Sequence, residues 1–389
     1  MSSKKMILII IALVVLFFIF MNVVLKKIQT VEMPIEVDDE GAVSAKMMAI
    51  ADRYRAEMDT PFVQDETIED MGVSVLFVDH LAKEAALVEG KACKAVDYTS
   101  LDHAMIACNS YMVQDRKRPT LILNVDVILG DPVERAIVSV YKHTLCTMEN
   151  LDPQNIQYFE TLDEDVQERY YRHRMVESLM DAYIDKENLE RFHYDYQQWC
   201  DHVGEPYQAI VDYDYYDGLQ AYIEVKVKAK LNDSFDLYYY LEGYKNEHGM
   251  YTKADEYKLM GLLWCLITER EGGDILWRDN MRSDRYKLLV EDVPLGMVED
   301  GLEYEDYQMC YAAYAKERDA WITQCQRNAE GVESRGLNLT SESYGQTVYL
   351  EKGKYIYFDY KARDVEGNVI ERDAIMAEVT PYRVKYYLN

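Results

Sequence analysis

The sequence has few cysteines for its length, and they form no recognisable pattern. Seven cysteines occur among 389 residues, with no CxxC pair among them: Cys93, Cys108, Cys146, Cys200, Cys265, Cys310 and Cys325. An odd number scattered through a long chain does not fit the disulfide framework of a small secreted domain. Structural zinc on cysteine ligands has no support either, because such sites use closely spaced cysteines.

Basic residues are also scarce. Lys and Arg number 42 against 70 Asp and Glu, which gives a formal net charge of −28 at pH 7. This charge repels phosphate backbones and anionic headgroups, so we expect no nucleic acid partner. Its simplest role is to keep the protein surface soluble. Low-complexity tracts are absent too, and a hydrophobic content of 49% is enough for a full-sized core.

The common catalytic motifs are missing. The chain has no HExxH or HxxxH pair, no GxSxG and no glycine-rich phosphate loop. His80 with Glu84, and His173 with Glu177, are four residues apart and could share an ion on a helix face, but a surface pair is the simpler interpretation. His202 comes at the end of a predicted helix, where an imidazole suits the helix dipole without any metal.

One acidic stretch is close to a calcium loop. An EF-hand has carboxylates at positions 1, 3 and 5, glycine at 6 and glutamate at 12. The corresponding residues are Asp212, Asp214, Asp217, Gly218 and Glu224. Glycine and glutamate each come one residue late, which would misplace the bidentate ligand. We therefore expect neither calcium nor any other metal or cofactor.

One long hydrophobic run is present, at residues 6–25. These 20 residues carry no charge, and as a helix they would be about 30 Å long, the thickness of a bilayer core. A cleaved signal peptide would have a shorter apolar region, and a core helix is rarely apolar on every face. The run therefore predicts a single transmembrane anchor. The flanking lysine pairs are symmetric, but the short tail at 1–5 favours an extracytoplasmic domain.

The rest of the chain divides into a linker at 26–43, an α-rich extracytoplasmic domain at 44–334 and a small β subdomain at 335–389. Apolar periodicity predicts helices at 44–58, 80–88, 132–150, 165–186, 188–203, 252–270 and 303–328. Strands are predicted at 72–78 and 120–123, with a polar connection at 109–118 and short strands joined by turns after residue 347. Asp131 with Pro132, and Thr252, are predicted helix starts. The expected fold is mainly α, or α+β.

Residues 217–231 fit two kinds of structure. Apolar and polar residues alternate from Ala221 to Leu231, which is the strand period. Leu219, Ile223, Val227 and Leu231 also form one helical stripe, and Glu224 stands four residues before Lys228. The periodicity leaves helix and strand open.

Several segments together resemble the zinc metallopeptidases called gluzincins, over roughly 120–280. They are a strand followed by a helix that opens at Gly130-Asp131-Pro132, then Asp217-Gly218-Leu219-Gln220-Ala221-Tyr222-Ile223-Glu224, then an apolar helix around 257–267. In that family the first helix carries HExxH. A later helix carries the third zinc ligand in a pattern similar to E-G-L-A-x-Y-x-E. The resemblance implies that residues 217–231 are helical.

The metal ligands of that family are not present in this chain. The alignment puts Tyr141, Lys142 and Leu145 where the family has His, Glu and His, and Asp217 where it has the ligand glutamate. An apolar side chain and a lysine cannot hold zinc, because the ion needs lone-pair donors. His143 stands two positions from Tyr141, about 200° around the helix. The resemblance therefore implies a degenerate peptidase fold.

These observations give three hypotheses. The first is a single-pass membrane protein whose extracytoplasmic domain is a non-catalytic, peptidase-like module that binds or scaffolds a protein partner. The second is a hydrolase with an unconventional site, for which the candidate residues are His143, His173, Glu177 and Asp217. It requires these four side chains to converge in one cleft. The third is a structural envelope component, assembled through the long helix and the β subdomain.

Overall fold

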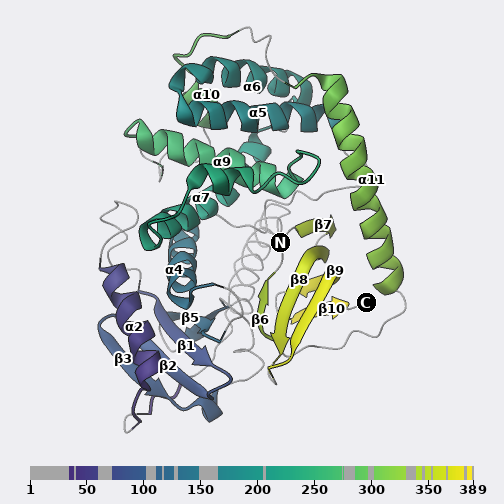
Figure 1. The fold of residues 1–389 in the computed structure, drawn as a ribbon. Coiled ribbons are helices and arrows are strands. Elements are labelled where there is room, and N and C mark those ends of the chain that lie inside the picture. Colours follow the sequence, from purple (N-terminus) through teal and green to yellow (C-terminus); the bar gives the residue numbers. More distant parts are fainter. Residues whose placement is uncertain are drawn as a thin grey trace, which may run out of the picture.

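The computed structural model describes most of the chain that follows residue 34. The described residues are 35–38, 41–59, 72–101, 111–115, 118–126, 130–148, 165–204, 207–273, 275, 285–296, 302–329, 339–343, 347–351, 354–364, 367–380 and 383–387. The predicted anchor at 6–25 lies outside them, and none of the helices within them is long and apolar enough to cross a membrane. They form a mixed α and β fold with a sheet lobe, a helical lobe and a β subdomain (Figure 1).

The sheet lobe is a five-stranded sheet covered on one face by α2 (Ala45–Met58). Its strands, in spatial order, are β3 (Ala92–Val96), β2 (Glu84–Glu89), β1 (Ser74–Asp79), β5 (Arg118–Asn124) and β4 (Tyr111–Asp115). β1 and β5 are parallel, and the other neighbours are antiparallel. Val75 and Phe77 of β1 face the core under α2, and Leu76 and Val78 face a second cluster on the opposite side. The strands predicted at 72–78 and 120–123 are confirmed.

Two predictions for the sheet lobe are wrong. Residues 80–88, predicted as a helix, form a turn and then β2, and Lys83 in the turn has a φ of 58°. The Ala85–Val88 run of β2 is buried on both faces, and periodicity alone cannot distinguish such a short apolar run from a buried helix. Within the expected polar connection, residues 111–115 form β4. This strand lies at the sheet edge, where polar residues are well tolerated.

Part of the predicted linker at 26–43 is attached to the sheet. Val37 forms an antiparallel bridge with Val96 of β3, and the Asp38 N–H donates to the Ala95 carbonyl at 3.0 Å. Ile35 is only 1% exposed and belongs to the apolar cluster on the face of the sheet opposite α2. Residues 35–38 therefore extend the sheet beyond β3 and belong to the folded domain.

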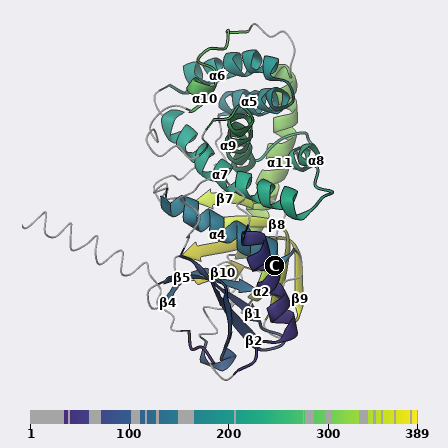
Figure 2. The same cartoon turned by 90° about the vertical axis from the view of Figure 1, so that its left-hand side faces the viewer.

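The helix α4 (Pro132–Met148) connects the sheet lobe to the helical lobe (Figure 2). It begins as predicted, because Asp131 Oδ1 accepts a hydrogen bond from the Val133 N–H at 3.0 Å and Pro132 occupies the first helical position. Val133, Ile137 and Val140 are buried in a core cluster that also contains residues of β1, β5, α2 and the helical lobe. One continuous core thus joins the two lobes.

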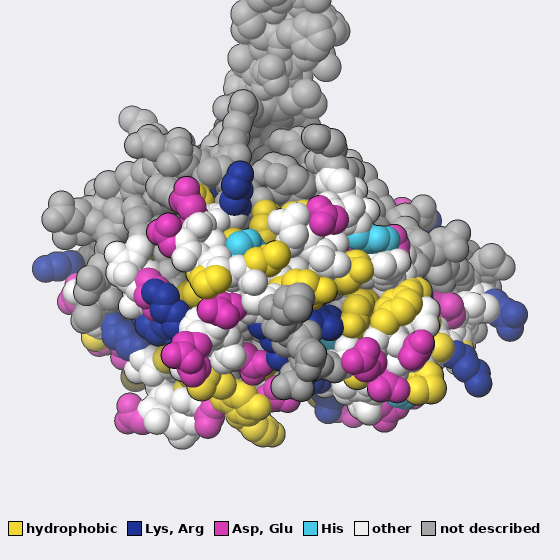
Figure 3. Space-filling model, turned by 90° about the horizontal axis from the view of Figure 1, so that it is seen from above, with side chains coloured by type: hydrophobic (Ala, Val, Ile, Leu, Met, Phe, Trp, Pro, Cys, Tyr) yellow, Lys and Arg dark blue, Asp and Glu magenta, His cyan; other side chains and the backbone are white. Residues whose placement is uncertain are grey.

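The helical lobe contains the other predicted helices and two short ones that the sequence analysis missed. Its helices are α5 (Val166–Ile184), α6 (Leu189–Val203), α7 (Tyr207–Leu231), α8 (Leu237–Glu242), α9 (Lys253–Arg270), α10 (Arg285–Leu289) and α11 (Tyr304–Ala329). The predicted cap of α9 is confirmed, since Thr252 Oγ1 accepts from the Asp255 N–H at 3.1 Å. Seen from above, the outer face of this lobe mixes hydrophobic, acidic and basic side chains (Figure 3).

Residues 217–231 are helical and form the second half of α7. The stripe of Leu219, Ile223 and Val227 is buried, but so are Ala221, Tyr222 and Val225. α7 packs against both α4 and α9, so most of its circumference faces other helices. The alternation of apolar and polar residues that suggested a strand has two causes. Apolar residues are needed on most sides of α7, and the lysines between them near its C-terminal end extend their charged groups toward solvent.

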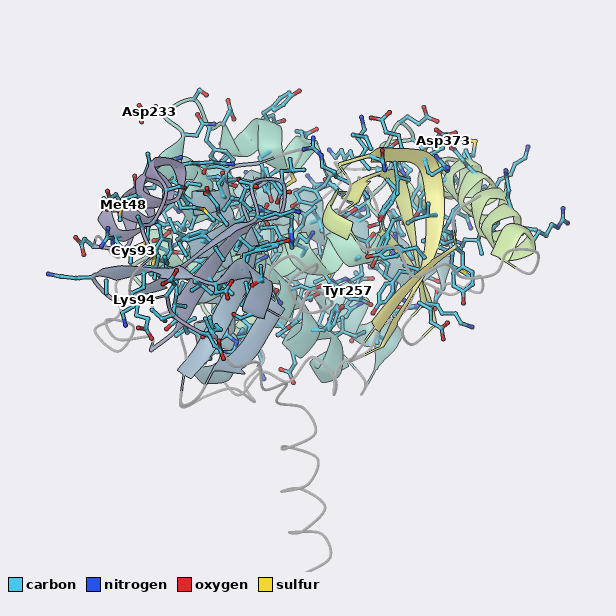
Figure 4. All side chains as sticks on the ribbon, turned by 90° about the horizontal axis from the view of Figure 1, so that it is seen from below. Met48, Cys93, Lys94, Asp233, Tyr257 and Asp373 are labelled. Atoms are coloured by element: carbon cyan, nitrogen blue, oxygen red, sulfur yellow. The ribbon has the colours of Figure 1, made fainter. Side chains whose placement is uncertain are left out.

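The β subdomain predicted at 335–389 is present as an antiparallel sheet. Its strands are β6 (Leu339–Ser343), β7 (Thr347–Glu351), β8 (Lys354–Asp364), β9 (Val369–Thr380) and β10 (Arg383–Tyr387). The order is β10-β9-β8-β6, with β7 also paired to β8. Seen from below, this subdomain and the sheet lobe lie side by side, with Asp373 and Lys94 at opposite edges of the molecule (Figure 4).

Candidate functional site

The candidate site is built around the crossing of α7 and α9, where two glycines let the helix backbones touch. A Cβ added to Gly218 would lie 2.1 Å from the carbonyl carbon of Gly261, and one added to Gly261 would lie 1.9 Å from the Asp214 carbonyl oxygen. No side chain fits at either position. Gly218 directly follows Asp217 in the peptidase-like stretch, so the close contact places that carboxylate beside α9.

Asp217 lies in a partly enclosed position between α4, α7 and α9. Burial raises the pKa of its carboxyl to about 6, although Lys258 of α9, Lys142 of α4 and a hydrogen bond with Tyr213 all act in the opposite direction. The carboxylate of Asp214, one turn earlier on α7, adds to the upward shift of the pKa. Lys142 and Asp217, two of the positions that the resemblance singles out, are therefore electrostatic neighbours.

Glu224 lies two turns after Asp217. Lys142 and Lys258, together with Lys228, compensate the negative charge of its carboxylate. Its carboxylate is 2.6 Å from Lys228 Nζ and 3.9 Å from Lys142 Nζ. Burial alone would raise the pKa of Glu224, but Lys142, Lys228 and Lys258 outweigh it and hold the pKa below its ordinary value. This glutamate is therefore ionised at neutral pH.

Two tyrosines of the α8 region line the same cluster. The Tyr240 and Tyr244 hydroxyls are 2.7 Å apart. Lys228 Nζ lies 5.0 Å from the centre of the Tyr240 ring, and Lys258 Nζ lies 5.4 Å from that of Tyr244. Both distances fit cation–π contacts. We call the following set the charge cluster: Lys142, Asp217, Glu224, Lys228, Tyr240, Tyr244 and Lys258.

The other two positions that the resemblance singles out, Tyr141 and Leu145, do not belong to the charge cluster. Tyr141 is 2% exposed and part of the main core. The side chain of Leu145 lies outside the described residues. His143 is partly buried on α4, and burial lowers the pKa of its imidazole.

His173 and Glu177 form a second polar site, on α5, and the predicted surface pair is wrong for His173. Its ring is 5% exposed and lies 5.1 Å from the ring of Tyr251 and 5.4 Å from that of Tyr307. Burial lowers the pKa of His173 to about 4 despite the nearby Glu177. Glu177 contacts the Tyr251 hydroxyl and Lys245 Nζ, and they hold its pKa low against the effect of burial.

The His80 and Glu84 pair predicted on a helix is also wrong, because the two residues flank the turn between β1 and β2. His80 is buried at the end of β1, where Nε2 lies 3.0 Å from Asn124 Oδ1 and Nδ1 lies 3.0 Å from the Tyr98 hydroxyl. His202 pairs with Asp165 Oδ2 at 2.8 Å. These two histidines make ordinary protein contacts.

Of the four residues in the hydrolase hypothesis, His173 and Glu177 are neighbours, but the groups that act on them are not those that act on Asp217. The groups that act on the Asp217 carboxyl are Lys258, Lys142, Tyr213 and Asp214. Those that act on the His173 imidazole are Glu177, Lys245 and Arg169. The acidic stretch that is close to a calcium loop lies within the continuous helix α7 instead of a loop. Its Asp214 is bound by Arg172, with oxygen to nitrogen distances of 2.7 and 2.5 Å.

Sequence reasoning missed two polar groupings. One is the buried pair of Arg172 and Asp214, to which Tyr286 donates a hydrogen bond at 2.8 Å. The other lies at the carboxyl ends of the parallel strands β1 and β5, where His80, Asn124 and Asp126 are all buried. A signal existed for the second, since each apolar strand runs directly into polar residues. No sequence signal pairs Arg172 with Asp214 across 42 positions.

A cavity of about 400 Å³ opens elsewhere in the helical lobe, between α6, α9, α10 and the turn at Lys186 that precedes α6. Its walls include the apolar side chains of Leu189, Trp264, Leu288 and Leu289, together with Lys186 and Arg285. The residues that line it do not belong to the charge cluster.

No protein-family model, no curated protein and no solved structure matches this chain. The resemblance to gluzincins therefore depends on the residues of the chain alone.

Proposed function

We propose that this chain is a single-pass membrane protein whose extracytoplasmic domain is a metallopeptidase-like fold without catalysis. In this proposal lysine ammonium groups take the place of the metal, and the domain acts by binding or scaffolding a protein partner. Along the chain, a mixed sheet is followed by α4, α7 and α9. This order is compatible with the resemblance to gluzincins.

The observation that carries the proposal is the position of Lys142 and Lys258 beside Asp217 and Glu224. Both lysines lower the pKa of both carboxyls, so their positive charges compensate the negative charge that a zinc ion would otherwise compensate. A zinc ion at this place would be repelled by the two ammonium groups and would find no imidazole donor at Tyr141 or Leu145. Lysine also has no lone pair while it is protonated, so Lys142 cannot act as a general base there.

The anchor is proposed from residues 6–25. Nine residues, 26–34, separate it from Ile35, which is buried against the sheet. Nine residues extend over at most about 30 Å. The proposed anchor would therefore hold the sheet lobe close to the bilayer, which suits a scaffolding role better than a long flexible tether does.

A partner would find apolar surface on the helical lobe. The cavity between α6, α9 and α10 is lined by Leu189, Trp264 and Leu289, and by Leu288, which is 38% exposed. Aromatic and aliphatic side chains in a concave site are typical of binding surfaces. This surface supports a binding role and needs no catalytic group.

Metal exchange at the charge cluster tests the proposal. The full chain, purified in detergent, is incubated with zinc and dialysed, and its metal content is compared with that of Asp217→Asn and Glu224→Gln. We expect that neither substitution changes the zinc content. A stoichiometric zinc ion that both substitutions remove would overturn the proposal.

Membrane extraction tests the anchor separately. We expect the full chain to stay in the membrane pellet after alkaline extraction, and a chain lacking residues 1–30 to appear in the supernatant. Protease added to intact cells or right-side-out vesicles is expected to digest the domain. Release of the full chain by alkali, or protection of the domain from external protease, would contradict this part of the proposal.

A further inference from the structure

Three potential metal ligands that do not belong to the charge cluster converge on the surface of the helical lobe. They are Glu247 and His248, in the connection between α8 and α9, and Glu317 on α11. One donor atom from each lies within 4.8 Å of the other two. His248 Nε2 is 3.0 Å from Glu317 Oε2 and 3.7 Å from Glu247 Oε1. The imidazole nitrogen is thus the centre of the set, with a carboxylate oxygen on each of two neighbouring segments.

Contacts that involve none of the three donor atoms hold the backbone of the set in place. The Asn246 side-chain oxygen accepts hydrogen bonds from the backbone N–H groups of His248, at 2.9 Å, and of Met250, at 3.0 Å. Met250 is 1% exposed and packs in one cluster with Tyr311 and Tyr314 of α11. Glu317 follows Tyr314 by one turn of the same helix. The loop and α11 are therefore held together by buried packing beneath the donor set.

The donor types and distances suit zinc. Zinc binds imidazole nitrogen at about 2.0–2.1 Å and carboxylate oxygen at about 2.0–2.2 Å, usually in tetrahedral geometry. Donors arranged in this way are about 3.3–3.5 Å apart. The two distances from His248 Nε2 bracket this value, and the two carboxylate oxygens lie within 4.8 Å of each other. Three protein ligands leave the fourth position of a tetrahedral zinc ion for water.

The charges of the set also favour a divalent cation. Two carboxylates within 4.8 Å of each other repel, and a neutral imidazole Nε2–H can donate to only one of them. The net charge of −28 further favours cation binding. Calcium and magnesium prefer oxygen donors alone, whereas an imidazole together with carboxylates suits zinc.

We propose that Glu247, His248 and Glu317 form a zinc site that ties the α8–α9 connection to α11. Zinc bound there joins two segments already in contact, so it stabilises the folded helical lobe. Because α11 also packs against β9, the site fastens the helix that leads into the β subdomain. This proposal does not depend on the function proposed above.

Calorimetric titration of the full chain with zinc chloride, after removal of metals by a chelator, tests the site. We expect one zinc ion per chain and a higher melting temperature with zinc than without it. Loss of an outer-shell partner alone weakens metal sites by roughly 10–100-fold. Loss of a ligand in His248→Gln or Glu317→Gln is therefore expected to weaken binding at least about 100-fold and to abolish the thermal shift.

The matched control is His202→Gln. His202 is as exposed as His248 and also pairs with a carboxylate, Asp165, but it belongs to no three-donor set among the described residues. Unchanged zinc affinity in His248→Gln and Glu317→Gln, or an equal loss in the control, would overturn the zinc site. Zinc binding that is lost in Asp217→Asn would overturn the proposed function, whereas zinc binding that is unchanged in His248→Gln would overturn this site, so the two failures are distinguishable.

Discussion

Asp214 and Asp217 are one turn apart on α7, yet their surroundings differ. Asp214 is fully buried, is bound at both oxygens by the guanidinium of Arg172 and also accepts from Tyr286. The Arg172 guanidinium lies 5.4 Å from the Trp199 ring and 5.2 Å from the Tyr257 ring. Asp217 is partly enclosed, and the charges of Lys258 and Lys142 compensate that of its carboxylate.

These surroundings indicate that the Asp214 carboxylate is needed for the stability of the core, whereas the Asp217 carboxylate can be replaced at a smaller cost in stability. A guanidinium forms two parallel hydrogen bonds with a carboxylate in a fixed geometry, whereas a lysine is a point charge on a flexible chain. Burial raises the pKa of both carboxyls, but only Asp214 has a guanidinium partner, and its carboxylate holds the pKa of Arg172 above the ordinary value. The Arg172–Asp214 pair is therefore part of the core, and Asp217 occupies the place where the peptidase-like resemblance puts a ligand.

Removing Asp214 is expected to have the largest effect on stability. Asp214→Ala leaves Arg172 buried without its partner, and breaking such a pair lowers the free energy of unfolding by about 3–5 kcal/mol. Urea unfolding of the full chain in detergent, followed by circular dichroism, measures it. Asp217→Ala is the matched substitution one turn away and is expected to be much milder. Equal losses for the two variants would remove the distinction between these carboxylates.

The next largest loss of stability is expected from a substitution at the contact between Gly218 of α7 and Gly261 of α9. Gly218→Ala puts a methyl group into the backbone of α9, and overpacking of this kind lowers the free energy of unfolding by about 1–3 kcal/mol. The control is Gly243→Ala, whose added Cβ would meet no atom closer than 3.3 Å. The same urea titration compares them, and a Gly218→Ala variant as stable as the control would contradict the close crossing of α7 and α9.

The raised pKa of Asp217 predicts a dependence of stability on pH. The folded pKa of about 6 lies above the ordinary value of 3.8, so the folded chain holds this proton more tightly than the unfolded chain. That contribution is fully present below about pH 4 and is lost as the pH rises through 6. The free energy of unfolding relative to Asp217→Asn is thus expected to fall by about 2 kcal/mol between pH 4 and pH 7. A difference that stays constant with pH would show that Asp217 is solvated.

Removing the charge of Lys142 gives the smallest effect. Lys142→Met takes away one of the two cations that lower the pKa of Asp217, so that pKa rises further. Since the lysine is partly exposed, the expected loss at pH 7 is about 1 kcal/mol or less. Lys142→Arg keeps the charge and is expected to behave as the unchanged chain. NMR titration of the Asp217 carboxyl compares the three chains, and an identical pKa in all of them would show that Lys142 is too far away to act.

The elements with explicit boundary signals could be predicted from the sequence. Asp131 with Pro132, and Thr252, mark helix starts whose capping hydrogen bonds are present in the structure. The helix at 217–231 could not be chosen over a strand by periodicity, because α7 is buried on most sides. The turn and strand at 80–89 were missed for a related reason, since a short apolar run buried on both faces shows no period.

The candidate site could be predicted only in part. The resemblance to gluzincins singled out Lys142 and Asp217, and in the structure the charge of Lys142 acts on the Asp217 carboxyl. It gave no indication of Lys258, whose place beside Asp217 depends on the glycine crossing of α7 and α9. The burial of His173 could not be read from its spacing to Glu177 either, because Tyr251 and Tyr307, which cover it, come from distant parts of the chain.

The central claim is that lysines, and no metal, compensate Asp217 and Glu224. Zinc content of the His248→Gln chain tests this most directly, because that substitution removes the proposed surface site and leaves the charge cluster intact. After incubation with zinc and dialysis, we predict no stoichiometric zinc in this variant by plasma mass spectrometry. One retained zinc ion per chain that is lost when Asp217→Asn is added would contradict the account.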